Sequence, residues 1–360
     1  MNIWPEIHHG GKRVPCAAAA GKKEEEMIDF SVNVTPLGIP ENIRSAMEES
    51  LNRAGWYPDY SKERLKRALG AFHHLEPSHI CMGNGAADVI YRTVFALKPK
   101  KALVLAPTFA EYAAALRCVD ARIDYYRIDH ADFQVKMDIC EQIEADTEMV
   151  FLCNPNNPTG LLISKDIIEK VLKRCEAVGA WLVVDECFLE FIADGEKYSV
   201  IEDLLHHERL MIIKSFTKMF GIAGLRLGYL LCGKAGLAER IDRFGCDWNV
   251  NCVAEAAGLE ALKSQDYIKK VIRYITKERE WLCRELTAMG FLTVHGAANY
   301  LLFKVPDGSR ENLGKWLLKR GIMLRCCDDY ENLDGTFYRI GMNRHEENRK
   351  LLEALKEWIK

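Results

Sequence analysis

The 360-residue sequence lacks the long apolar stretch that a membrane-spanning helix requires. Such a helix needs about 20 consecutive, mostly apolar residues, and charged residues interrupt every stretch of that length here. A secretory signal is missing as well, because residues 1–13 mix His, Glu and Lys and the alanine run at 17–20 is too short for an apolar signal core. We therefore expect a cytoplasmic protein with no membrane partner.

Metal-ligand and disulfide patterns are also missing, although the sequence holds 13 cysteines. No two of them form a C-x-x-C pair, and no His/Cys cluster has the spacing of metal ligands. An odd number of scattered cysteines indicates reduced thiols rather than a disulfide framework. Because no cluster has ligand spacing, we expect no bound metal. A net charge of −3 predicts no strongly basic face, so we expect no nucleic-acid partner.

Short apolar runs between about residue 80 and residue 235 alternate with amphipathic helical patterns. These runs are rich in Val, Leu and Ile without polar alternation, which is typical of strands buried on both faces of a parallel sheet. One helical pattern spans 164–178, with Ser164 as a candidate N-cap and Gly179 as a candidate C-cap. The alternation predicts a layered α/β domain. The runs are residues 102–106, 149–153, 181–184, 210–213 and 228–232.

The C-terminal third has a different pattern, which predicts a small α+β domain. Because 360 residues exceed the usual size of a single core, we predict a large domain at 40–255 and a small one formed by 1–39 and 256–360. No linker separates them, and joined domains commonly share a ligand cleft. The expected elements are helices at 265–289, about 311–320 and 345–359, and strands at 292–294, 300–304, 323–325 and 337–342.

A lysine-containing loop follows one buried run, with the sequence S-F-T-K-M-F-G at 215–221 and G-L-R-L-G at 224–228. A solvated lysine in a loop is one interpretation. The S-x-x-K motif of penicillin-recognising enzymes is another, but no S-D-N or K-T-G triplet accompanies it. In the third interpretation, Lys218 is a Schiff-base lysine, with the Ser215 hydroxyl and the Arg226 cation holding a cofactor phosphate. This loop alone leaves the question open.

Two more motifs follow buried runs. The segment N-P-N-N-P-T-G at 154–160 is either an ordinary turn or an amide group at the carboxyl edge of a sheet, where ligands bind. Asp185 either caps the next helix or pairs with the pyridine nitrogen of pyridoxal phosphate (PLP), which keeps the ring an electron sink.

The segment G-N-G-A-A-D at 83–88 begins like a dinucleotide fingerprint, but Asp88 occupies the third glycine position. The segment still suits a helix N-terminus that binds a phosphate through backbone N–H groups. Phe109 is either a core residue or a side chain that stacks on an aromatic cofactor.

This ordered set of motifs resembles the fold-type-I PLP family of aminotransferases, specifically the histidinol-phosphate aminotransferase branch, from His9 to the last helix. The resemblance implies an aspartate aminotransferase-like α/β fold with a mostly parallel sheet, plus the small α+β domain, with PLP as the cofactor. It implies Lys218 as the Schiff-base lysine, Asp185 at the pyridine nitrogen, Asn157 at the phenolic oxygen, Phe109 on the ring, and Gly85, Ala86, Ser215 and Arg226 at the phosphate.

Other implied roles concern the partner subunit and the substrate. Tyr57 matches a tyrosine that reaches the phosphate from the neighbouring subunit, so a homodimer is expected. Arg339 matches the arginine that binds the substrate α-carboxylate, and a guanidinium fork suits a planar carboxylate. Arg325 matches an arginine associated with the substrate phosphate. The alternative for either arginine is a surface salt bridge.

Three features are similar instead to the L-threonine-O-3-phosphate decarboxylases of cobalamin biosynthesis. They are His9-Gly10-Gly11, the segment D-F-S-V-N-V-T-P-L-G at 29–38 that contains Asn33, and Phe188, where aminotransferases of the branch usually have tyrosine. In those decarboxylases the His-Gly-Gly segment lies by the substrate, so His9, Gly10 and Asn33 become candidate substrate contacts. Cys187 departs from the pattern, because alanine is usual beneath the ring.

The resemblance therefore implies decarboxylation of L-threonine O-3-phosphate to (R)-1-amino-2-propanol O-2-phosphate, the linker of the cobalamin nucleotide loop. Anchoring both the phosphate and the carboxylate would fix the rotamer in which the Cα–carboxylate bond breaks. The alternatives are a histidinol-phosphate aminotransferase, an L-serine O-phosphate decarboxylase that gives ethanolamine phosphate, and a catalytically silent protein, which the intact set of cofactor motifs opposes.

Overall fold

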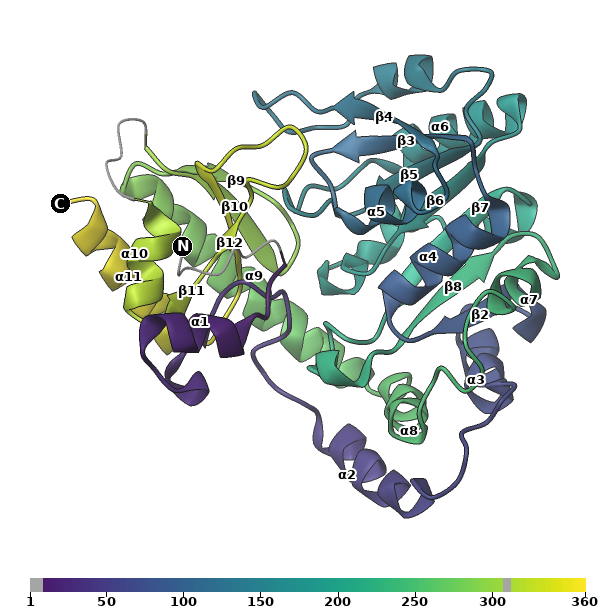
Figure 1. The fold of residues 1–360 in the computed structure, drawn as a ribbon, viewed down its shortest axis with the longest axis horizontal. Coiled ribbons are helices and arrows are strands. Elements are labelled where there is room, and N and C mark those ends of the chain that lie inside the picture. Colours follow the sequence, from purple (N-terminus) through teal and green to yellow (C-terminus); the bar gives the residue numbers. More distant parts are fainter. Residues whose placement is uncertain (1–8, 307–311) are drawn as a thin grey trace.

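The computed structural model describes residues 9–306 and 312–360. Two α/β bodies lie side by side: a large body built on a seven-stranded sheet and a small body built on a four-stranded sheet (Figure 1). The large body comprises the middle of the chain, whereas N-terminal and C-terminal segments together form the small body. The predicted α/β layering is thus confirmed, and the domain boundaries at 39/40 and 255/256 stay a prediction.

The sheet of the large body has the strand order β2-β8-β7-β6-β5-β3-β4. Strands β3 to β7 are parallel to one another. The central strands are almost entirely buried, which explains their uninterrupted apolar sequences. The strands are β2 Ile80–Gly83, β3 Lys101–Ala106, β4 Arg122–Arg127, β5 Met149–Cys153, β6 Trp181–Asp185, β7 Leu210–Ser215 and β8 Gly228–Cys232.

Two expectations about this sheet were wrong or incomplete. β8 was expected among the parallel strands, but it is antiparallel to both β7 and β2. The short lysine loop between β7 and β8 explains this, because a parallel return needs a long crossover connection. The edge strand β4 escaped prediction, since its sequence, R-I-D-Y-Y-R, is half polar and partly exposed.

Helices cover both faces of this sheet, and α4 packs against β7 and β8 (Figure 1). The expected helix at 164–178 is α6, Lys165–Val178, and Gly179 ends it in the left-handed conformation. Ser164 occupies the N-cap position, but its side chain accepts no capping hydrogen bond. The helices of this body are α2 Glu41–Ser50, α3 Glu63–His73, α4 Ala86–Leu97, α5 Glu111–Arg117, α6, α7 Leu237–Asp242 and α8 Cys252–Ala261.

The small body has an antiparallel sheet of strand order β12-β13-β10-β9, packed against α9, α10 and α11. The expected strand at 323–325 is divided between two sheets, because β11 pairs with β1 from the N-terminal segment while β12 pairs with β13. The predicted start of a helix at Glu311 lies outside the described residues. The elements are α1 Arg13–Ala20, β1 Ile28–Asp29, α9 Gln265–Ala288, β9 Leu292–Val294, β10 Tyr300–Lys304, α10 Leu313–Lys319, β11 Ile322–Met323, β12 Arg325–Cys326, β13 Phe337–Gly341 and α11 His345–Trp358.

None of the helices in the described ranges is both long enough and apolar enough to cross a membrane.

Candidate active site

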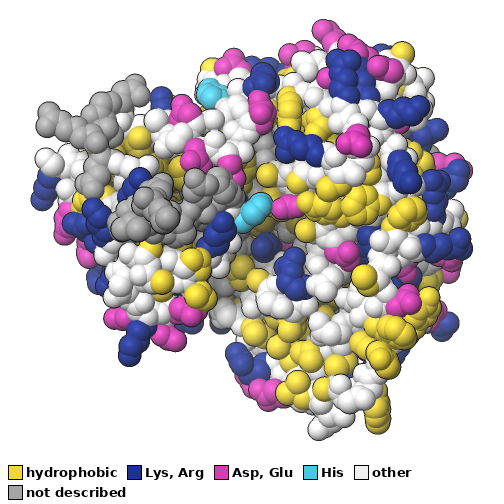
Figure 2. Space-filling model, in the orientation of Figure 1, with side chains coloured by type: hydrophobic (Ala, Val, Ile, Leu, Met, Phe, Trp, Pro, Cys, Tyr) yellow, Lys and Arg dark blue, Asp and Glu magenta, His cyan; other side chains and the backbone are white. Residues whose placement is uncertain are grey.

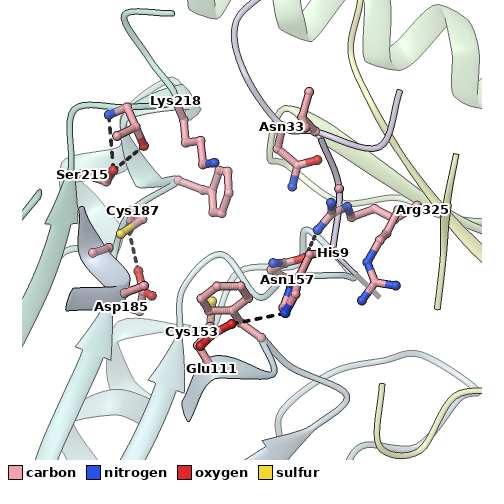
Figure 3. Close-up of a pocket in the computed structure, with 18 of the residues that line it drawn as sticks. His9, Asn33, Glu111, Cys153, Asn157, Asp185, Cys187, Ser215, Lys218 and Arg325 are labelled. Atoms are coloured by element: carbon pink, nitrogen blue, oxygen red, sulfur yellow. Dashed lines mark hydrogen bonds and ion pairs between the residues drawn. The ribbon is translucent and has the colours of Figure 1, made fainter. Parts of the chain in front are cut away.

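A cavity of about 330 Å³ lies between the two bodies, at the carboxyl ends of β5, β6 and β7. In Figure 3, Ser215, Cys187 and Asp185 lie on one side of this cavity, and Asn33, His9 and Arg325 lie on the other. Ligands commonly bind at such a sheet edge. Most of the predicted site residues line it: His9, Gly10, Asn33, Ala86, Phe109, Asn157, Asp185, Ser215, Lys218, Arg226, Arg325 and Arg339.

One end of the cavity has the groups that a phosphate requires. Helix α4 begins at Ala86 after Gly85, which has a φ of 87° and no capping side chain. A Cβ atom on Gly85 would lie 2.5 Å from Arg226 Nη2, so only glycine allows the guanidinium to approach this helix end. The buried hydroxyls of Ser215 and Thr217 are 2.7 Å apart. Free helical N–H groups, a cation and two hydroxyls together form an anion cradle.

The amine of Lys218 points into the middle of the cavity (Figure 3). Burial, and after it the positive charges of Arg339 and Arg226, together lower the pKa of Lys218 from its ordinary value of 10.5 to about 8. A substantial fraction of the amine is therefore unprotonated and nucleophilic near neutral pH.

Asp185 ends β6 and is 5% exposed. One carboxylate oxygen accepts a 2.6 Å hydrogen bond from the Tyr112 hydroxyl, and the other accepts a 2.9 Å bond from the Cys187 backbone N–H. Burial raises the pKa of Asp185, while the bonds from Cys187 and Tyr112 oppose that rise. A fixed, buried carboxylate of this kind suits a protonated ring nitrogen.

Asn157, in the turn after β5, is held by the small body. Its Oδ1 accepts a 2.6 Å bond from Arg339 Nη1 and a 3.3 Å bond from the Tyr330 hydroxyl. These bonds leave the amide N–H groups of Asn157 to donate toward the cavity. Arg339 also donates from Nη2 to the Ser31 carbonyl at 2.8 Å.

Two buried polar atoms near Arg339 lack partners. Within the described residues, nothing hydrogen-bonds Asn33 Oδ1 or Arg339 Nε. Both residues line the cavity and are less than a tenth exposed. Because a buried orphaned polar group is costly, these atoms mark a place where a polar ligand group would bind.

Arg325 and Arg339 are direct cross-strand partners in the pairing of β12 with β13. Both are buried, at 2% and 6% exposure. Asp329 compensates Arg325 through bonds of 2.7 and 2.8 Å from Nη2, and the Arg325 guanidinium lies 4.9 Å from the Tyr330 ring centre. Arg339 makes no ion pair within the described residues.

The N-terminal segment closes one side of the cavity. His9 Nε2 lies 3.3 Å from Glu111 Oε1 on α5, and the Gly11 N–H donates to Ser31 Oγ at 2.9 Å. Gly10 packs so tightly that a Cβ atom there would lie 2.1 Å from the Ser31 carbonyl oxygen. Close backbone packing thus requires glycine at position 10, and a φ of 84° favours glycine at position 11.

Two predicted site residues lie outside the cavity lining. Gly85 is directly behind it, against Arg226. Tyr57 is 80% exposed and packs at a tilt against Trp248, with ring centres 4.6 Å apart, and it is not among the residues that line the cavity. Tyr112 was missed in the sequence. It lies in the first turn of α5, lines the cavity and meets the Phe109 ring edge-on with ring centres 5.7 Å apart.

The donor set fits the predicted cofactor, PLP. The cavity offers a nucleophilic amine at Lys218, a buried acid at Asp185, the Asn157 amide and a phosphate cradle at the start of α4. Each of these groups matches a different functional group of the cofactor.

Comparison with known proteins adds independent findings. Residues 25–355 match the aminotransferase class I and II family. The chain is 33% identical over 350 residues to the threonine-phosphate decarboxylase of Salmonella typhimurium, covering 97% of this chain and 95% of that protein. It is also 33% identical over 352 residues to the histidinol-phosphate aminotransferase of Methanothermobacter thermautotrophicus, covering 95% and 92%.

A solved structure, the histidinol-phosphate aminotransferase from Sinorhizobium meliloti in complex with pyridoxal-5'-phosphate, matches with a TM-score of 0.85 at 21% identity, covering 97% of this chain and 95% of that one. This similarity confirms the predicted fold. Because two relatives of equal identity have different names, the reaction has to be inferred from the site.

Proposed function

Because the chain belongs to the aminotransferase class I and II family and is a PLP-dependent enzyme, we propose that it decarboxylates L-threonine O-3-phosphate. The product would be (R)-1-amino-2-propanol O-2-phosphate, the linker of the cobalamin nucleotide loop. The observation that carries this proposal is the pair of buried guanidinium groups, Arg325 and Arg339, on directly opposed positions of β12 and β13.

Two cations on opposed cross-strand positions repel each other, so their retention favours a ligand with two anionic groups. L-Threonine O-3-phosphate carries a carboxylate and a phosphate a few bonds apart. Arg325 is ion-paired with Asp329, whereas Arg339 makes no ion pair within the described residues. Histidinol phosphate would bring a single anionic group to these two guanidinium groups. The orphaned donor Arg339 Nε supports carboxylate binding at Arg339, and Arg325 then remains for the phosphate, while the orphaned Asn33 Oδ1 is an acceptor that suits the substrate amine.

When bound, PLP supplies an electron sink that weakens one bond at the substrate Cα. Arg339 and Arg325 would hold the substrate at its two ends and so select the rotamer that presents the carboxylate for loss. Asp185, fixed by its hydrogen bonds, would hold its carboxylate at the ring nitrogen. Lys218, whose pKa is about 8, can exist in both protonation states near neutral pH and would deliver a proton to Cα after the carboxylate leaves.

Phe188 supports decarboxylation over transamination. It is 9% exposed, lines the cavity and packs edge-on against Tyr300 at 5.0 Å. A phenyl ring gives the cavity no hydroxyl at this position, so Asn157 is the proposed donor to the cofactor's phenolic oxygen.

Product analysis tests this proposal. PLP-loaded protein is incubated with L-threonine O-3-phosphate and, separately, with L-serine O-phosphate, without any keto acid. We expect carbon dioxide and aminopropanol phosphate from the first substrate. Since one methyl group is discriminated by roughly 1–3 kcal/mol, the ratio of the two rates identifies the preferred substrate. Turnover only with histidinol phosphate and 2-oxoglutarate would instead identify an aminotransferase.

We also propose that the active form is a homodimer in which Tyr57 completes the phosphate site of the partner. Trp56, Tyr57 and Tyr60 are 73%, 80% and 62% exposed, and Trp248 is 42% exposed. Hydrophobic side chains gather on this face, over the region of α3 and α8 (Figure 2). A large exposed aromatic patch favours a protein interface. Sedimentation should give twice the 41.0 kDa chain mass, and a monomer that binds PLP fully would exclude the shared site.

A further inference from the structure

A cluster of charged side chains lies behind the phosphate cradle, where α3, α4 and α7 pack against β2 (Figure 1). None of its members is among the residues that line the cavity. Its arginine is 2% exposed, and both of its lysines are less than a tenth exposed. Because buried charges are costly unless they are paired, the arrangement of these groups calls for a physical account. The members are Arg92 and Asp88 on α4, Asp242 at the end of α7, and Lys62 and Lys66 at the start of α3.

Arg92 joins two carboxylates at the centre of this cluster. Its Nη2 donates to Asp88 Oδ2 at 2.8 Å, and its Nη1 donates to Asp242 Oδ1 at 2.9 Å. The backbone approaches this side chain closely, because a Cβ atom on Gly83 would lie 2.9 Å from Nη2 and one on Gly245 would lie 2.7 Å from Cδ. The guanidinium is therefore enclosed and held in one place between the two acids.

Asp88 connects Arg92 to the cradle. It lies in the first turn of α4, and its Oδ2 accepts a 2.8 Å hydrogen bond from the backbone N–H of Asn84. This bond fixes the chain where it enters the helix, and the next residues, Ala86 and Ala87, line the cavity. A carboxylate in this turn would repel a phosphate at the same helix end unless a cation neutralises it. Arg92, one turn further along α4, supplies that cation.

The two lysines prevent Asp242 from taking up the whole charge of Arg92. Lys62 Nζ lies 3.3 Å from Asp242 Oδ1, and Lys66 Nζ lies 3.5 Å from Oδ2, so Asp242 shares its single charge among three cations. The cluster thus holds three cations and two carboxylates, which leaves one net positive charge behind the cradle. Since buried charges are poorly screened, this charge favours an anion at the start of α4.

We propose that Arg92 is a positioning residue for the phosphate of PLP. It neutralises Asp88, so that this carboxylate can hold the Asn84 N–H without repelling the phosphate at the same helix end. Arg92 acts through Asp88, because it does not itself line the cavity. The inference rests on the assignment of the phosphate to the N-terminus of α4 and not on the identity of the substrate.

The test compares the binding of PLP with that of pyridoxal, which lacks the phosphate. Each is titrated into the PLP-free protein without substrate, and visible absorbance reports binding. In Arg92→Gln we expect the Kd of PLP to rise about tenfold, a usual size for charge effects at a partly buried helix end, and that of pyridoxal to change less than about twofold.

A double variant separates charge from packing. Asp88→Asn, added to Arg92→Gln, removes the uncompensated charge and keeps an oxygen that can accept the Asn84 N–H. The Kd of PLP should then return to within about threefold of the wild-type value. Arg279→Gln is the matched control, since Arg279 is a partly buried arginine of α9 that donates to the Ala298 carbonyl at 3.0 Å. It should leave both dissociation constants unchanged.

Three results would overturn the proposal. They are unchanged PLP binding in Arg92→Gln, equal weakening of PLP and pyridoxal in that variant, and a double variant that binds PLP no better than Arg92→Gln. If Arg92→Gln does not fold, Asp88→Asn alone decides, because PLP must then bind at least as tightly as in the wild type. A wild-type protein that binds PLP and pyridoxal equally well would remove the phosphate assignment and the proposal with it. Because no substrate is present, failure of the decarboxylase proposal does not affect these results.

Discussion

The two walls of the cavity differ in how complete they are without a ligand. The cofactor wall is formed by Ser215, Lys218 and Asp185 on the large body. Ser215 and Asp185 are hydrogen-bonded, and burial and neighbouring charges lower the pKa of Lys218. The substrate wall, formed by Asn33, Arg325 and Arg339 on the small body, includes orphaned atoms on Asn33 and Arg339. The comparison indicates that the fold prepares the cofactor wall in advance, while the other wall needs a ligand that accepts a hydrogen bond from Arg339 Nε and donates one to Asn33 Oδ1.

The largest expected effect comes from breaking the cofactor wall at Lys218. Lys218→Ala removes both the covalent attachment point and the proposed proton donor, so we expect kcat to fall by roughly 10⁴-fold, the upper range for a positioned acid–base group. The absorbance of the covalently bound cofactor should disappear as well. Lys234→Ala, at a half-exposed surface lysine, is the control. A Lys218→Ala protein that kept all its biological activity would revive the catalytically silent alternative.

Breaking the substrate wall at Arg339 should leave PLP bound, because Lys218 and the phosphate cradle keep all their atoms. Arg339→Gln removes the proposed carboxylate anchor, and loss of a buried charge partner costs about 3 kcal/mol, or roughly 10²-fold in kcat/KM. The PLP absorbance should persist in this variant, in contrast to Lys218→Ala. Steady-state kinetics on L-threonine O-3-phosphate measure the effect, and Arg349→Gln on the exposed face of α11 is the matched control. A variant that loses PLP together with substrate affinity would show that the two walls are not separable.

A smaller effect should couple the two walls through charge. Lys218 has a lowered pKa of about 8, so the unprotonated amine that captures PLP becomes abundant as pH rises through that value. Arg339 is one of the cations that hold this pKa down, although burial contributes more. In Arg339→Gln the pKa of Lys218 should therefore rise, and the midpoint for PLP capture by the apoprotein should move to higher pH. Stopped-flow capture rates at several pH values test this, and an unmoved midpoint would mean that Arg339 acts on substrate alone.

Sequence reasoning anticipated the cofactor wall better than the substrate wall, for a physical reason. Asp185, Asn157 and Lys218 each follow a buried apolar strand, and parallel strands bring such positions to one sheet edge. The substrate wall instead depends on segments far apart in the chain, since Ser31 and Arg339 meet only because the N-terminal segment joins the small body. Their roles came from the family resemblance and not from periodicity.

Other features were beyond sequence reasoning because they depend on packing. Nothing in the residues 111 and 112 indicated that Glu111 would meet His9 or that Tyr112 would bind Asp185. The antiparallel direction of β8 was missed for a similar reason, as a buried apolar run does not encode its direction. Tyr57 stays a prediction, because its proposed role needs a second copy of the chain.

The smallest expected effect comes from Phe188→Tyr, which tests whether this residue helps the site to favour decarboxylation over transamination. Phe188 packs against Tyr300 and contacts the cavity without a polar atom. Phe188→Tyr adds a hydroxyl beside the position proposed for the cofactor's phenolic oxygen, where Asn157 is the proposed donor. One additional hydrogen bond is worth about 1 kcal/mol, so decarboxylation should change by only a few-fold. The informative readout is the ratio of keto product to carbon dioxide when 2-oxoglutarate is also supplied. A rising ratio would assign part of the reaction specificity to Phe188, whereas a constant ratio would assign it to the anchors on Arg325 and Arg339 alone.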